Sequence, residues 1–135
     1  MSDENLQIVR GSWGAWIRGD LDAVFESLAP DVEWDTSTFE GWPDAGVYRG
    51  HDDVRRSFDE WLATWDRYEA GVDDYLDAGD DKVVVLAWQR GYGGGSDAPV
   101  EMRWVQVCTL RDGLVTRVEF YSDRARALEA AGLDA

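Results

Sequence analysis

Glu101 and Arg103 form the charged pair whose residue types and spacing are best suited to chemistry. They lie two positions apart in the β-prone run of residues 99–111, so in a strand their side chains point to the same face. On an inner face, a carboxylate and a guanidinium can hold a carbonyl-bearing or enolic ligand and transfer a proton. At the end of a sheet, they form an exposed ion pair that contributes little to stability. The sequence leaves both alternatives open.

The hairpin of residues 99–122 decides which face this pair occupies. Two apolar-rich runs flank Asp112-Gly113, and this dipeptide favours a tight two-residue turn between antiparallel strands. That turn places Val107 opposite Val118 and Val105 opposite Phe120, because cross-strand partners share a face. We therefore expect odd-numbered residues 101–107 to face inward with Val118 and Phe120.

The same alternation directs three large aromatic side chains to the outer face of the sheet: Trp88, Trp104 and Tyr121. Exposed together, they would form an extended apolar patch, which is uncommon on a monomer. We expect this outer face to form a homodimer.

Hydrophobic periodicity predicts the elements that position these residues. Apolar residues at helical spacing indicate helices over residues 4–18, 21–29 and 52–65, and Ser122 is expected to cap a last helix over residues 123–131. Strands are indicated over residues 31–35, 68–77 and 83–92 and in the hairpin. Helices that come first and strands that come later predict one α+β domain over residues 1–135, with the N-terminal helices packed in the concave face of a curved, mainly antiparallel sheet.

A sheet bent over helices forms a cone with one open end, which suits a small molecule. The chain contains eight Trp, and core packing alone explains most of them; rigid rings also shape a site for a flat apolar ligand. The residues expected to line the pocket are Trp13, Trp16, Trp42, Tyr48, Phe58, Trp61, Gln89, Val105, Val118 and Phe120.

Composition restricts the partners and the location. A formal net charge of −15 disfavours nucleic acids and anionic membrane surfaces. His51 and Cys108 are the single residues of their types, so we expect no metal site and no cofactor; His51 is expected to hydrogen-bond at a helix terminus. The sequence shows neither a signal-peptide pattern nor a membrane-spanning run, so we expect a cytoplasmic location.

Local strings distributed over essentially the whole chain resemble the SnoaL-like branch of the nuclear transport factor 2-like superfamily. The strings are RGDLDA at 18–23, APDVEW at 29–34, YRG at 48–50, LRDGLV at 110–115, YSDR at 121–124 and ALEA at 127–130. The resemblance implies the cone fold. It does not imply one activity, because the superfamily includes ketosteroid isomerases, polyketide cyclases, epoxide hydrolases and binding proteins without chemistry.

The resemblance also implies site residues. Asp35 falls near the catalytic base of ketosteroid isomerases, whereas the oxyanion-stabilising Tyr and Asp are replaced near Ser12 and near Val105 or Gln106. Asp35 is equally explained as a strand-end carboxylate that starts a turn.

We therefore expect the protein to bind an apolar, ring-containing ligand in a pocket. The expected reaction is isomerisation or cyclisation of this ligand by proton transfer through Asp35, aided by Glu101 and Arg103. The alternative is a binding or accessory dimerisation protein without enzymatic activity.

Overall fold

The computed structural model describes residues 2–37, 46–79, 81–93 and 98–133, and it confirms the α+β fold. The elements in chain order are α1 (Ser2–Arg18), α2 (Leu21–Glu26), β1 (Leu28–Asp35), β2 (Val47–Arg49), α3 (Gly50–Ala63), β3 (Arg67–Asp77), β4 (Lys82–Tyr92), β5 (Val100–Arg111), β6 (Leu114–Tyr121) and α4 (Arg124–Ala130). Within this described part, no helix is long and apolar enough to cross a membrane.

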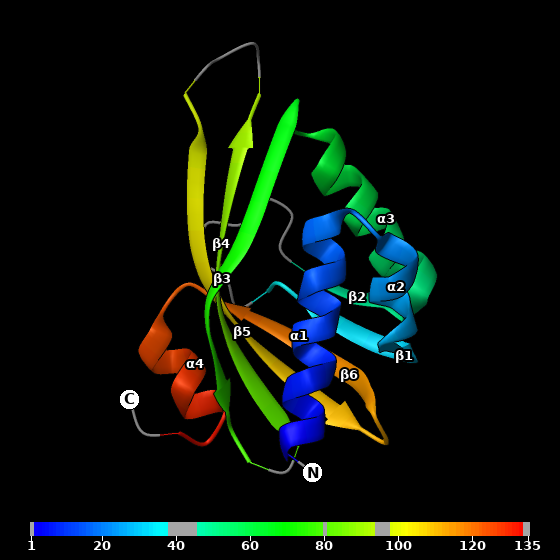
Figure 1. The fold of residues 1–135 in the computed structure, drawn as a ribbon, viewed down its shortest axis with the longest axis vertical. Coiled ribbons are helices and arrows are strands. Elements are labelled where there is room, and N and C mark those ends of the chain that lie inside the picture. The colour runs from blue at the N-terminus through cyan, green and yellow to red at the C-terminus, as the bar shows by residue number, and fades with distance from the viewer. Residues whose placement is uncertain (1, 38–45, 80, 94–97, 134–135) are drawn as a thin grey trace.

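The strands form one curved sheet in the order β2-β1-β6-β5-β4-β3. All neighbouring strands are antiparallel except β1 and β6, which run parallel. Figure 1 shows α1, α2 and α3 on one side of the sheet and α4 on the other. The predicted cone of helices inside a mainly antiparallel sheet is therefore confirmed.

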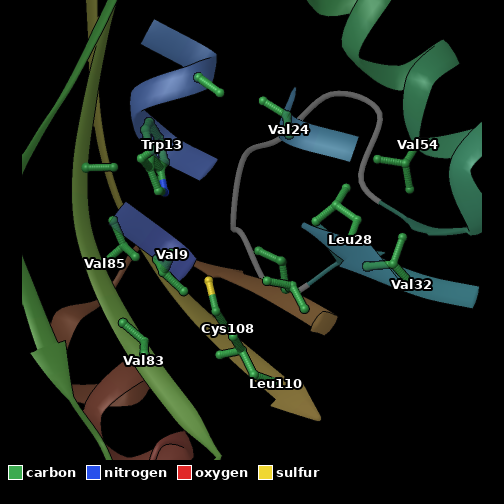
Figure 2. Packing of buried hydrophobic residues seen from close by; sticks show 14 of the residues in the cluster. Val9, Trp13, Val24, Leu28, Val32, Val54, Val83, Val85, Cys108 and Leu110 are labelled. Carbon is green, nitrogen blue, oxygen red and sulfur yellow. The ribbon is translucent and has the colours of Figure 1, made fainter. Parts of the chain in front are cut away.

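The main core lies between the sheet and the helices α1, α2 and α3 (Figure 2). Val9 of α1, Val24 of α2 and Val54 of α3 all point into it and are buried. Each fully buried side chain of this size contributes about 1.5–3 kcal/mol to folding. A second, smaller cluster lies on the other face of the sheet, under α4, and is formed by Val84, Val105, Val107, Ala127, Leu128 and Ala131.

A one-residue bulge in β6 makes the predicted hairpin register wrong. The pairing follows the Asp112-Gly113 turn as far as Leu110 and Val115, but the next residue, Thr109, pairs with Arg117. Thr116 is thus the extra residue of the bulge. Beyond this point every β5 residue pairs one position further along β6 than the turn alone predicts. Each β5 side chain therefore lies on the opposite face of the sheet from the one predicted relative to β6.

As a result, the even-numbered residues of β5 face the helices, and the expectation that odd-numbered residues face inward is wrong. Trp104 is 2% exposed in the main core, whereas Val105 belongs to the cluster under α4. The partner of Trp104 on β4 is Ala87, whose small side chain leaves room for the indole. Trp104 stacks on Phe120 with ring centroids 6.0 Å apart.

The structure also differs from the predictions at α2, β1, β2 and α4. The second helix ends at Glu26, because β1 begins already at Leu28 and includes Pro30. Pro30 has no N–H to donate, and it lies in the irregular part of the β1–β6 ladder between Leu28 and Glu33. The short strand β2 was not predicted, and Asp123 rather than Ser122 caps α4, accepting a hydrogen bond from the Ala125 N–H at 2.9 Å.

Candidate functional site

The interior of the cone retains a cavity of about 80 Å³ that is partly open to solvent. It lies between α1, α2, α3 and the inner faces of β1, β4, β5 and β6. The lining residues are Val9, Ser12, Trp13, Trp16, Val24, Leu28, Trp34, Thr36, Ser57, Phe58, Trp61, Gln89, Gln106, Cys108, Val115, Val118 and Phe120.

Aromatic rings in edge contact form much of the wall. The ring of Phe58 lies with its centroid 5.0 Å from that of Trp16 and 4.9 Å from that of Trp34. Trp34 also contacts Phe120, with centroids 5.4 Å apart. Such contacts between rings add about 0.5–1.5 kcal/mol beyond the buried area, so they stabilise this wall.

Two buried glutamines supply the main polar groups. Gln106 Oε1 accepts a hydrogen bond from Trp13 Nε1 at 3.2 Å, and Gln89 Oε1 accepts one from Trp61 Nε1 at 2.7 Å. The residues Gln89 and Gln106 are 5% and 4% exposed. The two indoles therefore connect α1 and α3 to the inner face of the sheet.

The remaining polar lining groups are neutral. The Thr36 hydroxyl donates to the Gly46 carbonyl at 3.2 Å and accepts from the Gly46 N–H at 3.1 Å. Burial raises the pKa of the Cys108 thiol from 9.0 to about 12, so the thiol stays protonated at neutral pH. None of the described residues that line the cavity is an Asp, Glu, Lys, Arg or His.

Seven of the ten residues expected to line the pocket do so: Trp13, Trp16, Phe58, Trp61, Gln89, Val118 and Phe120. Val105 points to the outer face because of the β6 bulge, so this expectation is wrong. Tyr48 lies on β2 and packs against the core without lining the cavity. Trp42 lies outside the described residues.

Sequence reasoning missed several of the described lining residues, among them Trp34 and Gln106. Side chains on β1 alternate between the two faces of the sheet, so Trp34 shares a face with Val32, two positions earlier, and Asp35 lies on the other face. The buried Val32 marks the inner face of that strand. An alternation signal was therefore present for Trp34. Gln106 was assigned to the outer face by the two-residue turn, and only the bulge reverses it.

Asp35 is buried but does not point into the cavity. It is 6% exposed and lies on the outer face of β1, and the inner position next to it belongs to Thr36. Its carboxylate accepts hydrogen bonds from the Ser37 N–H at 2.9 Å, from the Ser37 hydroxyl, and from Arg117 Nη2 at 3.3 Å. Asp35 is thus a strand-end carboxylate that starts a turn, and the guanidinium of Arg117 adds a charged partner to it.

Arg117 is the centre of a charged cluster on the outer face. Besides Asp35, it lies 3.5 Å from Glu33 and 3.6 Å from Glu119. The Tyr121 hydroxyl donates to Glu119 at 2.9 Å, and burial together with this carboxylate raises the tyrosine pKa to about 12. These groups hold one another across β1 and β6 and have no access to the cone interior.

Glu101 and Arg103 also lie outside the cavity, so the expectation that they face inward is wrong. Both side chains are exposed on the outer face. Glu101 accepts two hydrogen bonds from Arg90, at 2.9 and 2.7 Å, and Arg103 pairs with Asp73. The structure does not bring Asp35, Glu101 and Arg103 together.

The expected dimer surface loses one of its three residues. Trp104 is in the core, whereas Trp88 covers Gly71 and Tyr121 contacts the cluster under α4, both on the outer face. A homodimer through this face remains a prediction. The described residues contain no group of three or more His, Cys, Asp or Glu side chains able to hold a metal ion.

Comparisons with known proteins agree with this architecture. Residues 9–118 match the model of the SnoaL-like domain. The uncharacterized protein Rv0034 of Mycobacterium tuberculosis is 31% identical over 125 residues, which are 91% of this chain and 92% of that protein.

Two solved structures share the fold. A nuclear transport factor 2-like protein from Burkholderia thailandensis is 28% identical, with a TM-score of 0.76 over 94% of this chain and 95% of that chain. TerC, co-crystallized with polyporic acid, is 20% identical with a TM-score of 0.76 over 96% and 98% of the two chains. The chain therefore belongs to the SnoaL-like domain family, within the nuclear transport factor 2-like superfamily.

Proposed function

We propose that this protein binds a small, neutral and mainly apolar molecule in the cone interior, without transferring a proton through Asp35. The observation that carries the proposal is the lining: an aromatic and aliphatic wall with two buried amides and, among the described residues, no charged side chain. Sites with few polar groups in an apolar wall are typical of small-molecule binding.

The cavity volume restricts the size of the ligand. An engineered apolar cavity of about 150 Å³ binds benzene, and the cavity here has about half that volume. A single ring therefore requires small movements of the wall or extends through the open side. Aromatic side chains of the protein itself fill part of the cone interior.

The placement of the charged groups supports binding rather than acid–base chemistry. A general base must come within hydrogen-bonding reach of the proton that it removes. Asp35, Glu101 and Arg103 are held in ion pairs or hydrogen bonds on the outer face. That TerC, a protein of the same fold, crystallised with polyporic acid supports an organic ligand here as well.

Titration calorimetry with α-methylstyrene, a neutral single-ring probe, tests the proposal. The variant Ser57→Phe places a ring into the cavity from α3 and should lower the affinity at least tenfold, whereas Asp59→Phe, exposed on the same helix, should leave it within twofold. Both variants need an unfolding midpoint close to that of the wild type. Absence of binding to the wild type, or equal affinity in both variants, would refute the proposal.

A further inference from the structure

We infer that the ligand is recognised through hydrogen-bond acceptor atoms, such as carbonyl or ether oxygens, which bind the amide N–H groups of Gln89 and Gln106. The inference rests on the proposed function, since it specifies the ligand of the same cavity. Both side chains line that cavity, from β4 and β5.

A tryptophan fixes the orientation of each amide. An indole N–H only donates, so the amide atom that faces it must be the oxygen. Trp13 and Trp61 therefore hold Gln106 and Gln89 with their Oε1 atoms toward the helices. Each Nε2 group is directed away from its indole, and exchange of the two ends by a flip would lose the hydrogen bond.

The two Nε2 groups have no acceptor among the described residues. The hydrogen bonds of Gln89 and Gln106 are made by their Oε1 atoms, although both side chains are more than nine-tenths buried. Neither Nε2 is among the fully buried donors of the described residues, so each reaches the partly open cavity. A donor there that meets only an apolar ligand loses its contact with water without a replacement. A ligand atom that accepts from Nε2 removes this deficit, whereas a purely apolar ligand leaves it.

The two donors serve different parts of the cavity. Gln106 pairs with Val85 across β4 and β5, and Gln89 lies four residues further along β4. At about 3.3 Å per residue, the two positions are about 13 Å apart along the strand. A small ligand therefore uses one amide or the other.

The arrangement also selects against other ligand classes. Each Oε1 already accepts a hydrogen bond from an indole, so a ligand with only donor groups must share that oxygen. A ligand acceptor, by contrast, meets an N–H that bonds no described residue. None of the described lining residues supplies a cation to offset the desolvation of an anionic ligand. A neutral ketone, ester, ether or quinone fits both conditions.

The experiment compares two probes of the same shape, acetophenone and α-methylstyrene, in which a carbonyl oxygen replaces a methylene group. Calorimetry gives the ratio of their affinities in the wild type and in the double variant Gln89→Met/Gln106→Met. Methionine retains the length of the side chain and removes the donors. We expect the ratio to favour acetophenone at least fivefold more in the wild type than in the double variant, as the loss of one hydrogen bond predicts.

A second variant, Trp13→Phe, keeps the test independent of the stability of the double variant. It frees Gln106 Oε1, so the affinity for the donor-only probe indole should rise about fivefold, while that for α-methylstyrene changes little. A role of Trp13 in packing alone would not change the preference between donors and acceptors.

The outcomes separate the two proposals. If α-methylstyrene binds but the affinity ratio is the same in the wild type and in the double variant, the assignment to the glutamines is wrong and the proposed function stands. An unchanged affinity for indole in Trp13→Phe would also contradict the assignment. If neither probe binds the wild type, the proposed function itself is wrong, and this inference fails with it.

Discussion

Single residues decide the polarity of the interior. Asp35 shows that a shift of one position along a strand moves a side chain from the cavity to the outer face of the sheet. Its strand neighbours Trp34 and Thr36 line the cavity, while its own carboxylate is held by Ser37 and Arg117 on the other face. A side chain that falls near the catalytic base of ketosteroid isomerases thus stabilises the end of β1. Buried carboxylates with several charge-assisted hydrogen bonds usually contribute to stability.

Asp35→Asn should therefore lower the free energy of unfolding by about 1–3 kcal/mol, because it weakens the bonds to Ser37 and Arg117. The affinity for acetophenone should stay within twofold of the wild type. Urea unfolding and calorimetry measure both effects. Asp31→Asn, exposed on the same strand, serves as the control and should change stability by less than about 0.5 kcal/mol. A stable Asp35→Asn variant that no longer binds acetophenone would contradict this account and show that Asp35 takes part in ligand binding.

Cys108 should make the fold sensitive to alkaline pH. Its pKa is raised from 9.0 to about 12 by burial, so the unfolded chain releases the thiol proton before the folded chain does. The resulting stability is fully present below pH 9 and is lost progressively between pH 9 and pH 12. From pH 8 to pH 10, the wild type should lose about 1 kcal/mol more than Cys108→Ala, measured by urea unfolding. Equal losses of unfolding free energy in the wild type and Cys108→Ala would show that the thiol has the same pKa in the folded and the unfolded chain.

At the scale of elements, the β6 bulge determines which side chains form the cavity. Near the turn, Leu110 and Val115 face the helices. Beyond the bulge, five further side chains also face the helices: Trp104, Gln106, Cys108, Val118 and Phe120. The Thr116 hydroxyl donates to the Thr109 carbonyl at 3.2 Å within the bulge. Without the extra residue, one of the two strands would turn its apolar side chains to the outer face.

Deletion of Thr116 should therefore destabilise the protein by about 4 kcal/mol or more, since it displaces at least two buried side chains such as Val118 and Phe120. Thr116→Ala keeps the number of residues and should cost only about 1 kcal/mol. Equilibrium unfolding in urea compares the two variants. Similar stability of the two would mean that the register tolerates the loss of the bulge.

Two glycines give a further test at this scale. A Cβ at Gly91 of β4 would lie 2.4 Å from the ring of Trp65, whereas a Cβ at Gly11 of α1 meets nothing within 4 Å. Gly91→Ala should cost about 1–3 kcal/mol through overpacking, and Gly11→Ala should stabilise the helix by about 0.5–1 kcal/mol. Thermal unfolding should thus shift in opposite directions. A neutral Gly91→Ala would show that the indole can move aside.

Much of the fold followed from sequence, and the wrong assignments of β5 side chains to the two sheet faces have one physical origin. The periodicity of residues 4–18 and 83–92 and the Asp112-Gly113 turn predicted α1, β4 and the hairpin within one or two residues. The bulge left no such signal, because Thr116 and its neighbours are ordinary strand residues. That one residue moved Trp104 and Gln106 inside and Val105, Glu101 and Arg103 outside.

At the scale of the whole molecule, the described side chains that line the cone interior are neutral, and the described charged ones lie outside the cavity. The long-range field of a chain with a net charge of −15 repels anions, in agreement with a neutral ligand. The predicted homodimer would use the outer face that carries Trp88 and Tyr121. Sedimentation at micromolar concentration tests it, and the mass of a monomer would contradict it.

The most direct test of the account is an NMR titration of the labelled protein with acetophenone, which follows the indole N–H signals. Trp13 and Trp61 hold the two glutamines inside the cone, and Trp88 lies on the outer face. We predict that the Trp13 and Trp61 signals shift with a common saturation curve while the Trp88 signal stays unchanged. Shifts confined to Trp88, with Trp13 and Trp61 unaffected, would place the ligand outside the cone and contradict the account.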